Sequence, residues 1–139
     1  MIVLLDTDVL IDVALDRRPF VEYSSAILDL AENSQIKGFI AWHSVANFYY
    51  LVSSASNKKL TRNFIIELLQ FIEISETKTE DAIYAANLNV PDLEDGLQIA
   101  AAKACGADFI LTRNLKHYKK SPITAITPEV FIKNIKTKI

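Results

Sequence analysis

The chain begins with a short apolar run that leads directly into acidic residues. Ile2-Val3-Leu4-Leu5 contains no polar side chain, and Asp6 and Asp8 follow it at once. Strands that are buried on both faces of a parallel sheet have this unbroken, branched composition. The two acids would then lie at the carboxyl end of such a strand. Open α/β sheets bind their ligands at that edge.

Segments with strand-like and helix-like patterns alternate along the rest of the chain. We expect further strands at 38–41, 71–74, 109–111 and 123–126, separated by helices that include 24–33, 61–72, 80–88 and 94–105. Strands that alternate with helices imply a parallel sheet covered by helices. The sequence therefore predicts a three-layer α/β/α sandwich with a short, mainly parallel central sheet. The length favours a single domain over residues 1–139.

Several helix ends carry residues that commonly cap helices. Gly106 follows the alanine-rich segment 94–105, where a glycine can end a helix in the left-handed conformation. We expect Thr79 to cap the helix over 80–88. Asp92 and Asp95 are three positions apart, which is the spacing of a capping box.

The composition excludes several classes of protein. Half of the 139 residues are hydrophobic, 23% are charged, and the net charge is −2, as in ordinary globular proteins. No apolar run approaches the roughly 20 residues that cross a bilayer. No signal-peptide pattern is present. The single cysteine, Cys105, cannot form an internal disulfide. We therefore expect a cytoplasmic protein that does not associate with membranes.

A second acidic cluster, Asp92, Glu94 and Asp95, lies at the start of the helix over 94–105. That helix is small and apolar, so we expect it to pack against the sheet and to direct Asp95 toward Asp6. Carboxylate oxygens are the ligands that Mg²⁺ and Mn²⁺ prefer. A purely structural alternative remains open. Asp6 can cap the next helix, and acids at a helix N-terminus are stabilised by the helix dipole.

Other site chemistries lack the residues they need. One cysteine and two separated histidines cannot form a zinc site, and no glycine-rich phosphate loop is present. We expect His43 to lie at a helix start and His117 to lie in an exposed basic turn. Basic residues gather after Arg113, and a cationic segment near an acidic centre would suit a phosphodiester substrate.

The segments Leu-Leu-Asp-Thr-Asp-Val-Leu (4–10), Ser-Val-Ala-Asn-Phe-Tyr-Tyr (44–50), Leu-Glu-Asp-Gly-Leu-Gln-Ile-Ala-Ala (93–101) and Gly-Ala-Asp-Phe-Ile-Leu-Thr-Arg-Asn (106–114) occur in this order. Together they resemble the PIN-domain family, which includes toxins of the VapC type. The ending Thr-Pro-Glu-Val-Phe (127–131) is also similar to the family ending. The resemblance covers essentially the whole chain.

This resemblance implies a three-layer nuclease fold and a metal-dependent endoribonuclease that uses one or two Mg²⁺ or Mn²⁺ ions. By position, it implies that Asp6 and Asp95 are metal-binding acids and that Asp92 is a neighbouring acid that ligates or orients. Asp8 would assist the first acid. Thr112 and Asn114 match the polar motif after the fourth strand. The catalytic and metal-binding set is then Asp6, Asp92 and Asp95, with Asn114 as a further catalytic residue.

The chain departs from the family pattern at Asn47, where the family carries a glutamate. A neutral amide oxygen replaces a carboxylate there, and affinity for hard cations follows ligand charge. Asp8, Asp92 or Glu94 could compensate. The alternative is a weakened or inactive PIN domain that serves as an RNA- or protein-binding module.

The resemblance also implies partners. RNA would be the substrate, with Arg113, Lys116 and Lys119 as candidate phosphate contacts. Family toxins pair with small antitoxin proteins and commonly form homodimers. The run Phe48-Tyr49-Tyr50 is apolar on more than one helical face, so it would form either a dimer surface or ordinary core packing.

Overall fold

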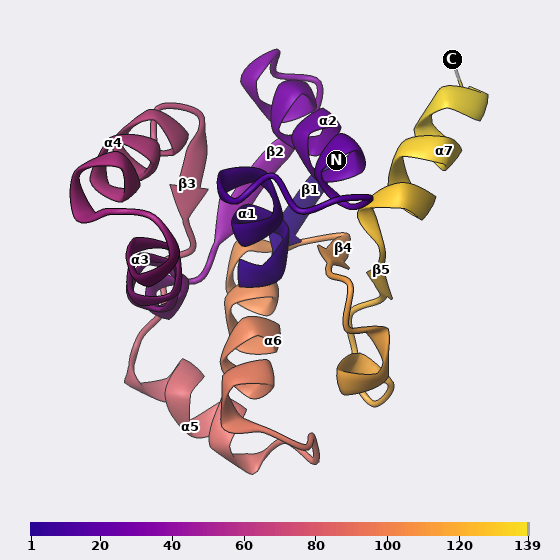
Figure 1. Ribbon diagram of the computed structural model, residues 1–139. Helices are drawn as coiled ribbons and strands as arrows, with labels where there is room; N and C mark the ends of the chain where they lie inside the picture. The colour runs from indigo at the N-terminus through magenta and orange to yellow at the C-terminus, as the bar shows by residue number, and fades with distance from the viewer. Residues whose placement is uncertain (139) are drawn as a thin grey trace.

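The computed structural model describes residues 1–138 and contains a sheet of five strands whose pairings are all parallel (Figure 1). The strand order is β3-β2-β1-β4-β5, so β1 lies in the centre. The strands are β1 (Ile2–Leu5), β2 (Lys37–Ile40), β3 (Ile72–Ile74), β4 (Phe109–Leu111) and β5 (Ala125–Ile126).

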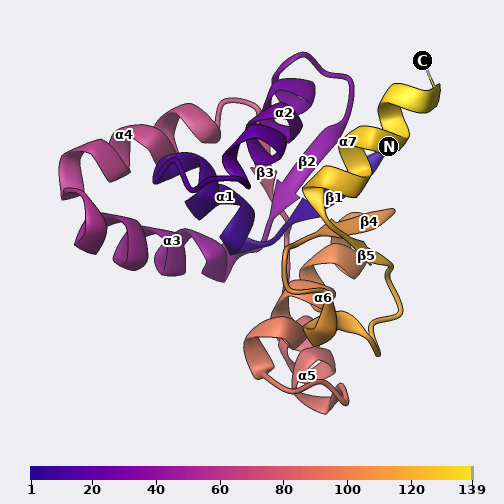
Figure 2. The same ribbon diagram turned by 45° about the vertical axis from the view of Figure 1, so that its right-hand side comes forward.

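Helices cover both faces of this sheet. Figures 1 and 2 show α5 (Thr79–Asn87) and α6 (Leu93–Cys105) together on one face. The other layer contains α1 (Thr7–Ala14), α2 (Val21–Glu32), α3 (Trp42–Ala55), α4 (Lys58–Leu68) and α7 (Pro128–Lys138). The predicted three-layer sandwich is therefore confirmed. Within residues 1–138, no helix is both long enough and apolar enough to cross a membrane.

The central strand explains the apolar run at the start of the sequence. Val3 and Leu5 pack into the core under α1, α2 and α3, whereas Leu4 packs into the core under α6. All three side chains are fully buried, because helices cover both faces of β1. The strand is thus fixed from both sides, and its carboxyl end has a defined position.

The strand order has a topological switch point at β1, and the acidic residues that follow β1 lie beside it. From β1 the chain builds β2 and β3 on one side, and then β4 and β5 on the other. The N–H of Asp6 donates to the carbonyl of Leu111 (2.9 Å), and the N–H of Thr112 donates to the carbonyl of Ile126 (3.0 Å). Polar residues that follow β1 and β4 are therefore neighbours at one edge of the sheet.

Some predicted boundaries were wrong for identifiable reasons. The helix expected at 61–72 begins at Lys58, because the side chain of Asn57 accepts a bond from the N–H of Leu60 (2.8 Å) and caps it. It ends at Leu68, because Ile72 pairs into β3. The last strand is shorter than predicted and covers only Ala125–Ile126.

The predicted caps had mixed outcomes. Gly106 ends α6 in the left-handed conformation (φ 69°), as predicted. Thr79 is not a cap, because it is the first residue inside α5. There the side chain of Asp81 accepts a bond from the N–H of Lys78 (2.8 Å). A short 3₁₀ helix, η1 (Leu115–Tyr118), was not predicted.

Candidate metal centre

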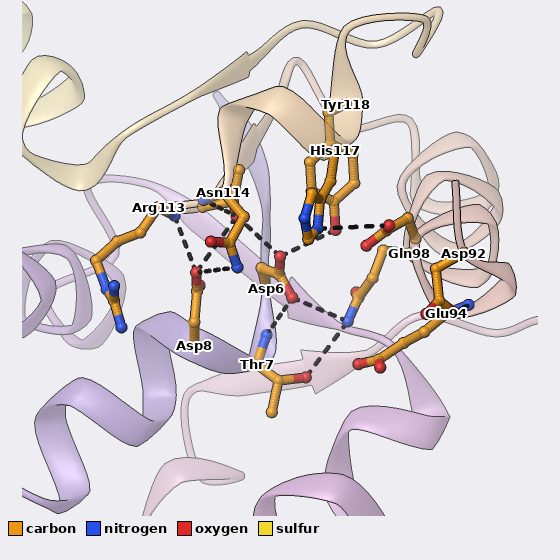
Figure 3. Close-up of polar contacts among 12 residues, drawn as sticks. Asp6, Thr7, Asp8, Asp92, Glu94, Gln98, Arg113, Asn114, His117 and Tyr118 are labelled. Carbon is orange, nitrogen blue, oxygen red and sulfur yellow. Dashed lines mark hydrogen bonds and ion pairs between the residues drawn. The ribbon is translucent and has the colours of Figure 1, made fainter. Parts of the chain in front are cut away.

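Asp6 follows β1 directly and is the N-cap of α1. It can therefore be both a helix cap and a metal ligand, the two roles that the sequence suggested. Its Oδ1 atom accepts the N–H of Thr7 (2.7 Å), which caps α1. Its Oδ2 atom accepts the hydroxyls of Thr112 (2.8 Å) and Tyr118 (2.9 Å) (Figure 3). Gln98 adds a longer contact to Oδ1 at 3.3 Å. These donors fix the carboxylate and stabilise its charge, although the residue is only 8% exposed.

Tyr118 is a donor that sequence analysis did not single out. The residue ends η1 and is buried beneath the site. Burial, followed by the charge of Asp6, raises the pKa of the Tyr118 phenol. The hydroxyl therefore keeps its proton and remains a donor to Asp6.

A buried polar network supports the Asp6 carboxylate from the α6 side. Nε2 of Gln98 donates to the hydroxyl of Ser44 (2.9 Å), and the Thr7 hydroxyl also donates to that of Ser44 (3.0 Å). Oε1 of Gln98 has no hydrogen-bond partner within residues 1–138. Sequence analysis missed Gln98. The available signal was a glutamine within an otherwise apolar helical face.

Asp95 reaches the same cleft from the first turn of α6. It is 8% exposed, and its buried Oδ2 atom has no hydrogen-bond partner among the residues that the structure describes. Nδ1 of His117 lies 3.6 Å away. Burial raises the pKa of Asp95, His117 opposes this shift, and the charges of Asp6 and other nearby acids add to it. A buried carboxylate oxygen without a hydrogen-bond donor is costly, and His117 is a charge partner only when it is protonated, so this atom is suited to a cation.

The structure corrects what the sequence predicted for the cap of α6 and for His117. Asp95 does not complete a capping box. Asp92 alone caps α6, by accepting the N–H of Glu94 on its Oδ1 atom (2.9 Å). His117 was expected in an exposed basic turn, but its 40%-exposed side chain lies in η1 and faces Asp95. His43 lies at the start of α3, as predicted.

The mouth of the cleft is formed by α3 and α6. Nδ2 of Asn47 donates to Oε1 of Glu94 (3.0 Å). The cleft has a volume of about 450 Å³, and its polar lining consists of Asp6, Thr7, Asp8, Asn47, Tyr50, Asp92, Glu94, Asp95, Asn114 and His117. The structure thus brings together most of the predicted site residues.

Asp8 lies on the side of Asp6 that faces β4. Its Oδ2 atom accepts the N–H of Arg113 (3.0 Å), with longer contacts to Asn114 Nδ2 (3.4 Å) and Thr112 Oγ1 (3.5 Å) (Figure 3). Burial, followed by the charge of Asp6, raises the pKa of Asp8 to about 7. These contacts hold the segment that follows β4 against the start of α1.

Arg113 has a protein partner that sequence analysis did not foresee. Its Nε and Nη2 atoms donate to the two carboxylate oxygens of Asp12, at 2.6 and 3.0 Å. Asp12 is fully buried, and the guanidinium lies 4.0 Å from the centre of the Phe20 ring. The hydrogen bond to Asp12 raises the pKa of Arg113 further. Lys116 and Lys119, the other predicted phosphate contacts, are exposed in and just after η1.

The donor set of the cleft fits a hard divalent cation. Within residues 1–138, no three His, Cys, Asp or Glu side chains are arranged to hold an ion by themselves. Mg²⁺ needs fewer protein ligands than that, because it keeps several waters and commonly uses one or two carboxylates. Asp6 is held in place, and Asp95 offers an oxygen that accepts no hydrogen bond in the described chain. Two carboxylates are therefore available in a cleft lined by further oxygen donors.

Comparison with known proteins identifies the family of this chain. The model of the PIN domain family matches residues 2–116. The chain belongs to the PIN domain family. The resemblance drawn from the four sequence segments is thus confirmed. Ribonuclease VapC1 of Aquifex aeolicus (strain VF5) is 27% identical to this PIN domain over 133 residues, which cover 93% of this chain and 92% of the relative.

Solved structures of VapC-type proteins share the fold. VapBC2 from Rickettsia felis, bound to a DNA fragment from their promoter, matches with a TM-score of 0.71 and 21% identity over 91% of this chain and 98% of that chain. VapBC-1 from nontypeable Haemophilus influenzae matches with a TM-score of 0.69 and 14% identity, over 93% and 99%. The sarcin-ricin loop cleaving toxin VapC20 of Mycobacterium tuberculosis matches with a TM-score of 0.62 and 10% identity, over 78% and 86%.

Proposed function

We propose that this protein is an endoribonuclease that depends on Mg²⁺ or Mn²⁺, and that Asp6 and Asp95 hold the ion. The observation that carries the proposal is the contrast between these two acids. Four contacts fix the Asp6 carboxylate, whereas the buried Oδ2 atom of Asp95 has no hydrogen-bond partner in the described chain. An ion bound between them would give this oxygen a direct positive partner, whereas His117 lies 3.6 Å away.

The chain provides the rest of the site around these two ligands. When bound, such an ion polarises a phosphoryl oxygen and lowers the pKa of a coordinated water. Asp92 and Asn114 line the cleft and are proposed to contact the ion's waters or the substrate. Thr112 and Tyr118 hold Asp6 in position through their hydroxyls. Asp8 fixes the loop that carries Asn114.

Substrate contacts are proposed for the basic segment beside the cleft. Lys116 and Lys119 are exposed next to His117, which lines the cleft, so they are placed to contact phosphates that flank the scissile bond. Arg113 remains a predicted RNA contact, but two of its five N–H donors are bound to Asp12. Its larger contribution is proposed to be ordering of the loop after β4.

A toxin role with a protein partner is the finer part of the proposal. Two of the similar structures are named as VapBC assemblies, and a third is named as a toxin. On α3, an exposed aromatic side chain beside the cleft supports a protein contact. Phe48 is buried and its ring stacks on that of Phe64 (5.2 Å between ring centres), whereas Tyr50 is 69% exposed and lines the cleft. We propose an antitoxin and a second copy of the chain as partners. Light scattering of the purified chain tests the homodimer.

RNA cleavage tests the proposed activity. Wild type, Asp6→Asn and Asp95→Asn are assayed on RNA with Mg²⁺ or Mn²⁺ and with excess EDTA. Asp29→Asn, an exposed acid on α2, is the matched control. We expect each site variant to lose about 100-fold or more in rate, because metal ions contribute several kcal/mol to catalysis. Wild type and the control should cleave, and EDTA should stop them. Equal rates in all four proteins would overturn the proposal.

A second candidate function is supported by Asn47 alone. A PIN domain with a neutral residue there could bind RNA or protein without cutting. Titration with Mn²⁺ separates the two candidates. Saturable binding supports the nuclease, and RNA binding without any Mn²⁺ binding at millimolar concentration supports the binding module.

A further inference from the structure

Asn47 and Glu94 meet across the mouth of the cleft, although they belong to helices on opposite faces of the sheet. Nδ2 of Asn47 in α3 donates to Oε1 of Glu94 in α6 at 3.0 Å. Both residues line the same cleft as Asp6 and Asp95. In Figure 3 the Glu94 side chain extends away from its helix in the direction of Thr7. The exposed carboxylate is thus held at the mouth of the cleft by its bond to Asn47.

The chemistry of this bond explains why an amide is useful at position 47. A carboxylate at both positions would bring two negative charges together, whereas the Asn47 amide donates to Glu94. The side chain of Asp92 accepts the N–H of Glu94 and fixes the turn from which Glu94 extends (2.9 Å). Glu94 is therefore positioned both at its backbone and at its carboxylate.

Two further observations connect Glu94 with the buried part of the site. Glu94 and Asp95 are adjacent residues in the first turn of α6, and both line the same cleft. Oδ2 of Asp95 is buried and lacks a hydrogen-bond partner within the described chain. A cation placed at this atom would lie in a cleft that is also lined by the acidic residues Asp6, Asp8, Asp92 and Glu94.

We propose that Glu94, oriented by Asn47, adds negative charge to the metal centre from the mouth of the cleft, as an outer carboxylate that does not contact the ion directly. The inference rests on the proposed function, because it names a further residue for the same ion. The resemblance implied a glutamate at position 47 on α3, and in this chain the negative charge comes instead from α6, with Asn47 as its positioning residue. Glu94 would then act on the ion through its charge and through the ion's waters, and loss of such an outer partner typically lowers metal affinity about 10- to 100-fold.

A structural role for Glu94 makes a different prediction. An acid in the first turn of a helix stabilises that helix by about 0.3–1 kcal/mol through the dipole. If this were its only role, Glu94→Gln would lower the thermal stability of the metal-free protein slightly and leave its affinity for Mn²⁺ unchanged. Metal affinity is therefore the readout that distinguishes the two roles.

The full chain is first treated with EDTA and then titrated with Mn²⁺. The paramagnetic signal of the free ion reports how much Mn²⁺ remains unbound. The variants are Glu94→Gln, Asn47→Ala, and the exchange Asn47→Glu with Glu94→Gln. Glu80→Gln is the matched control, because it also removes an acid from the first turn of a helix. We expect Glu94→Gln to weaken binding about 10-fold or more, and Asn47→Ala to weaken it less. The exchange should restore most of the affinity, and the control should bind like wild type.

The outcomes separate this inference from the proposed function. If wild type binds no Mn²⁺, the proposed function itself fails. If wild type binds, Asp95→Asn loses binding and Glu94→Gln binds like wild type, the proposed function stands and the inference is overturned. If the exchange variant binds Mn²⁺ no more tightly than Glu94→Gln alone, the role assigned to Asn47 is overturned. Circular-dichroism melting of each metal-free variant verifies that it is folded.

Discussion

Acidic side chains lie on both sides of Asp6, but only on one side is an acid paired with an arginine in the described chain. On the closed side, defined by Asp12 and Arg113, the fully buried Asp12 forms a bidentate ion pair with the guanidinium. On the open side, defined by Asp92, Glu94 and Asp95, no Lys or Arg of the described chain forms an ion pair with these acids. Only the partly exposed His117 lies close to Asp95.

The difference shows how residues of one type acquire separate roles. A buried acid with a cation of its own has its charge compensated within the fold, so it holds elements together. A buried acid without one retains an unmet demand for positive charge, and such groups gather at functional sites. Asp12 therefore joins α1 to the loop after β4, whereas Asp95 remains available to a ligand.

The largest expected effect tests the structural role of the closed side. Arg113→Met would leave the carboxylate of Asp12 buried without a cation. Breaking a buried pair in this way costs about 3–5 kcal/mol. We expect urea unfolding to show a loss of that size, while Asp95→Asn changes the free energy of unfolding little or raises it. A cost for Arg113→Met below about 1 kcal/mol would contradict the comparison.

A smaller effect is expected between the two sides, at Asp6 itself. Tyr118→Phe removes one hydroxyl donor from the Asp6 carboxylate. Hydrogen bonds to charged groups contribute about 1.5–3 kcal/mol, so urea unfolding should report a loss in that range. Tyr50→Phe, at an exposed tyrosine, is the control and should be neutral. A neutral Tyr118→Phe would mean that Asp6 does not depend on this donor.

The smallest effect concerns protonation. Arg113 on the closed side stays charged, whereas burial lowers the pKa of His43, near the open side, below its usual 6.5. Below about pH 6.5, His43 takes up a proton in the unfolded chain, whereas in the folded protein it remains neutral to a lower pH. The unfolded state then binds more protons, and the His43 contribution to stability falls as the pH falls.

This prediction is measured as a difference between two proteins. Urea unfolding of wild type and His43→Gln is compared from about pH 7.5 to about pH 5.5. Wild type should lose stability relative to the variant over the acidic half of this range. Because Asp8 and Asp95 titrate in both proteins, their contributions cancel in the comparison. Parallel curves would show that His43 does not stay neutral in the folded state.

Local patterns were sufficient to predict the sheet and two of the site acids. The apolar run before Asp6 and the small apolar helix after Asp95 each place a carboxylate at the end of a buried element. An element that is buried on both faces needs apolar residues at nearly every position, so it can be recognised in the sequence. Helix and strand ends were less certain, because Ile72 satisfies the pattern of a helix and of a strand.

The partners of these acids could not be predicted in the same way. The pairs Arg113 with Asp12 and Asn47 with Glu94 join residues 101 and 47 positions apart. Which of several acids meets which donor depends on how the helix ends approach one another across the sheet. Nothing in the spacing of Asp6, Asp8 and Asp12 shows that only one of them is paired with an arginine.

Locating a bound ion tests the central claim most directly. Crystals grown or soaked with Mn²⁺ can be measured at a wavelength where manganese scatters anomalously. The account predicts an anomalous peak on the open side, in contact with the carboxylates of Asp6 and Asp95. A peak beside Asp12 and Arg113, or no peak in the cleft at saturating Mn²⁺, would contradict it.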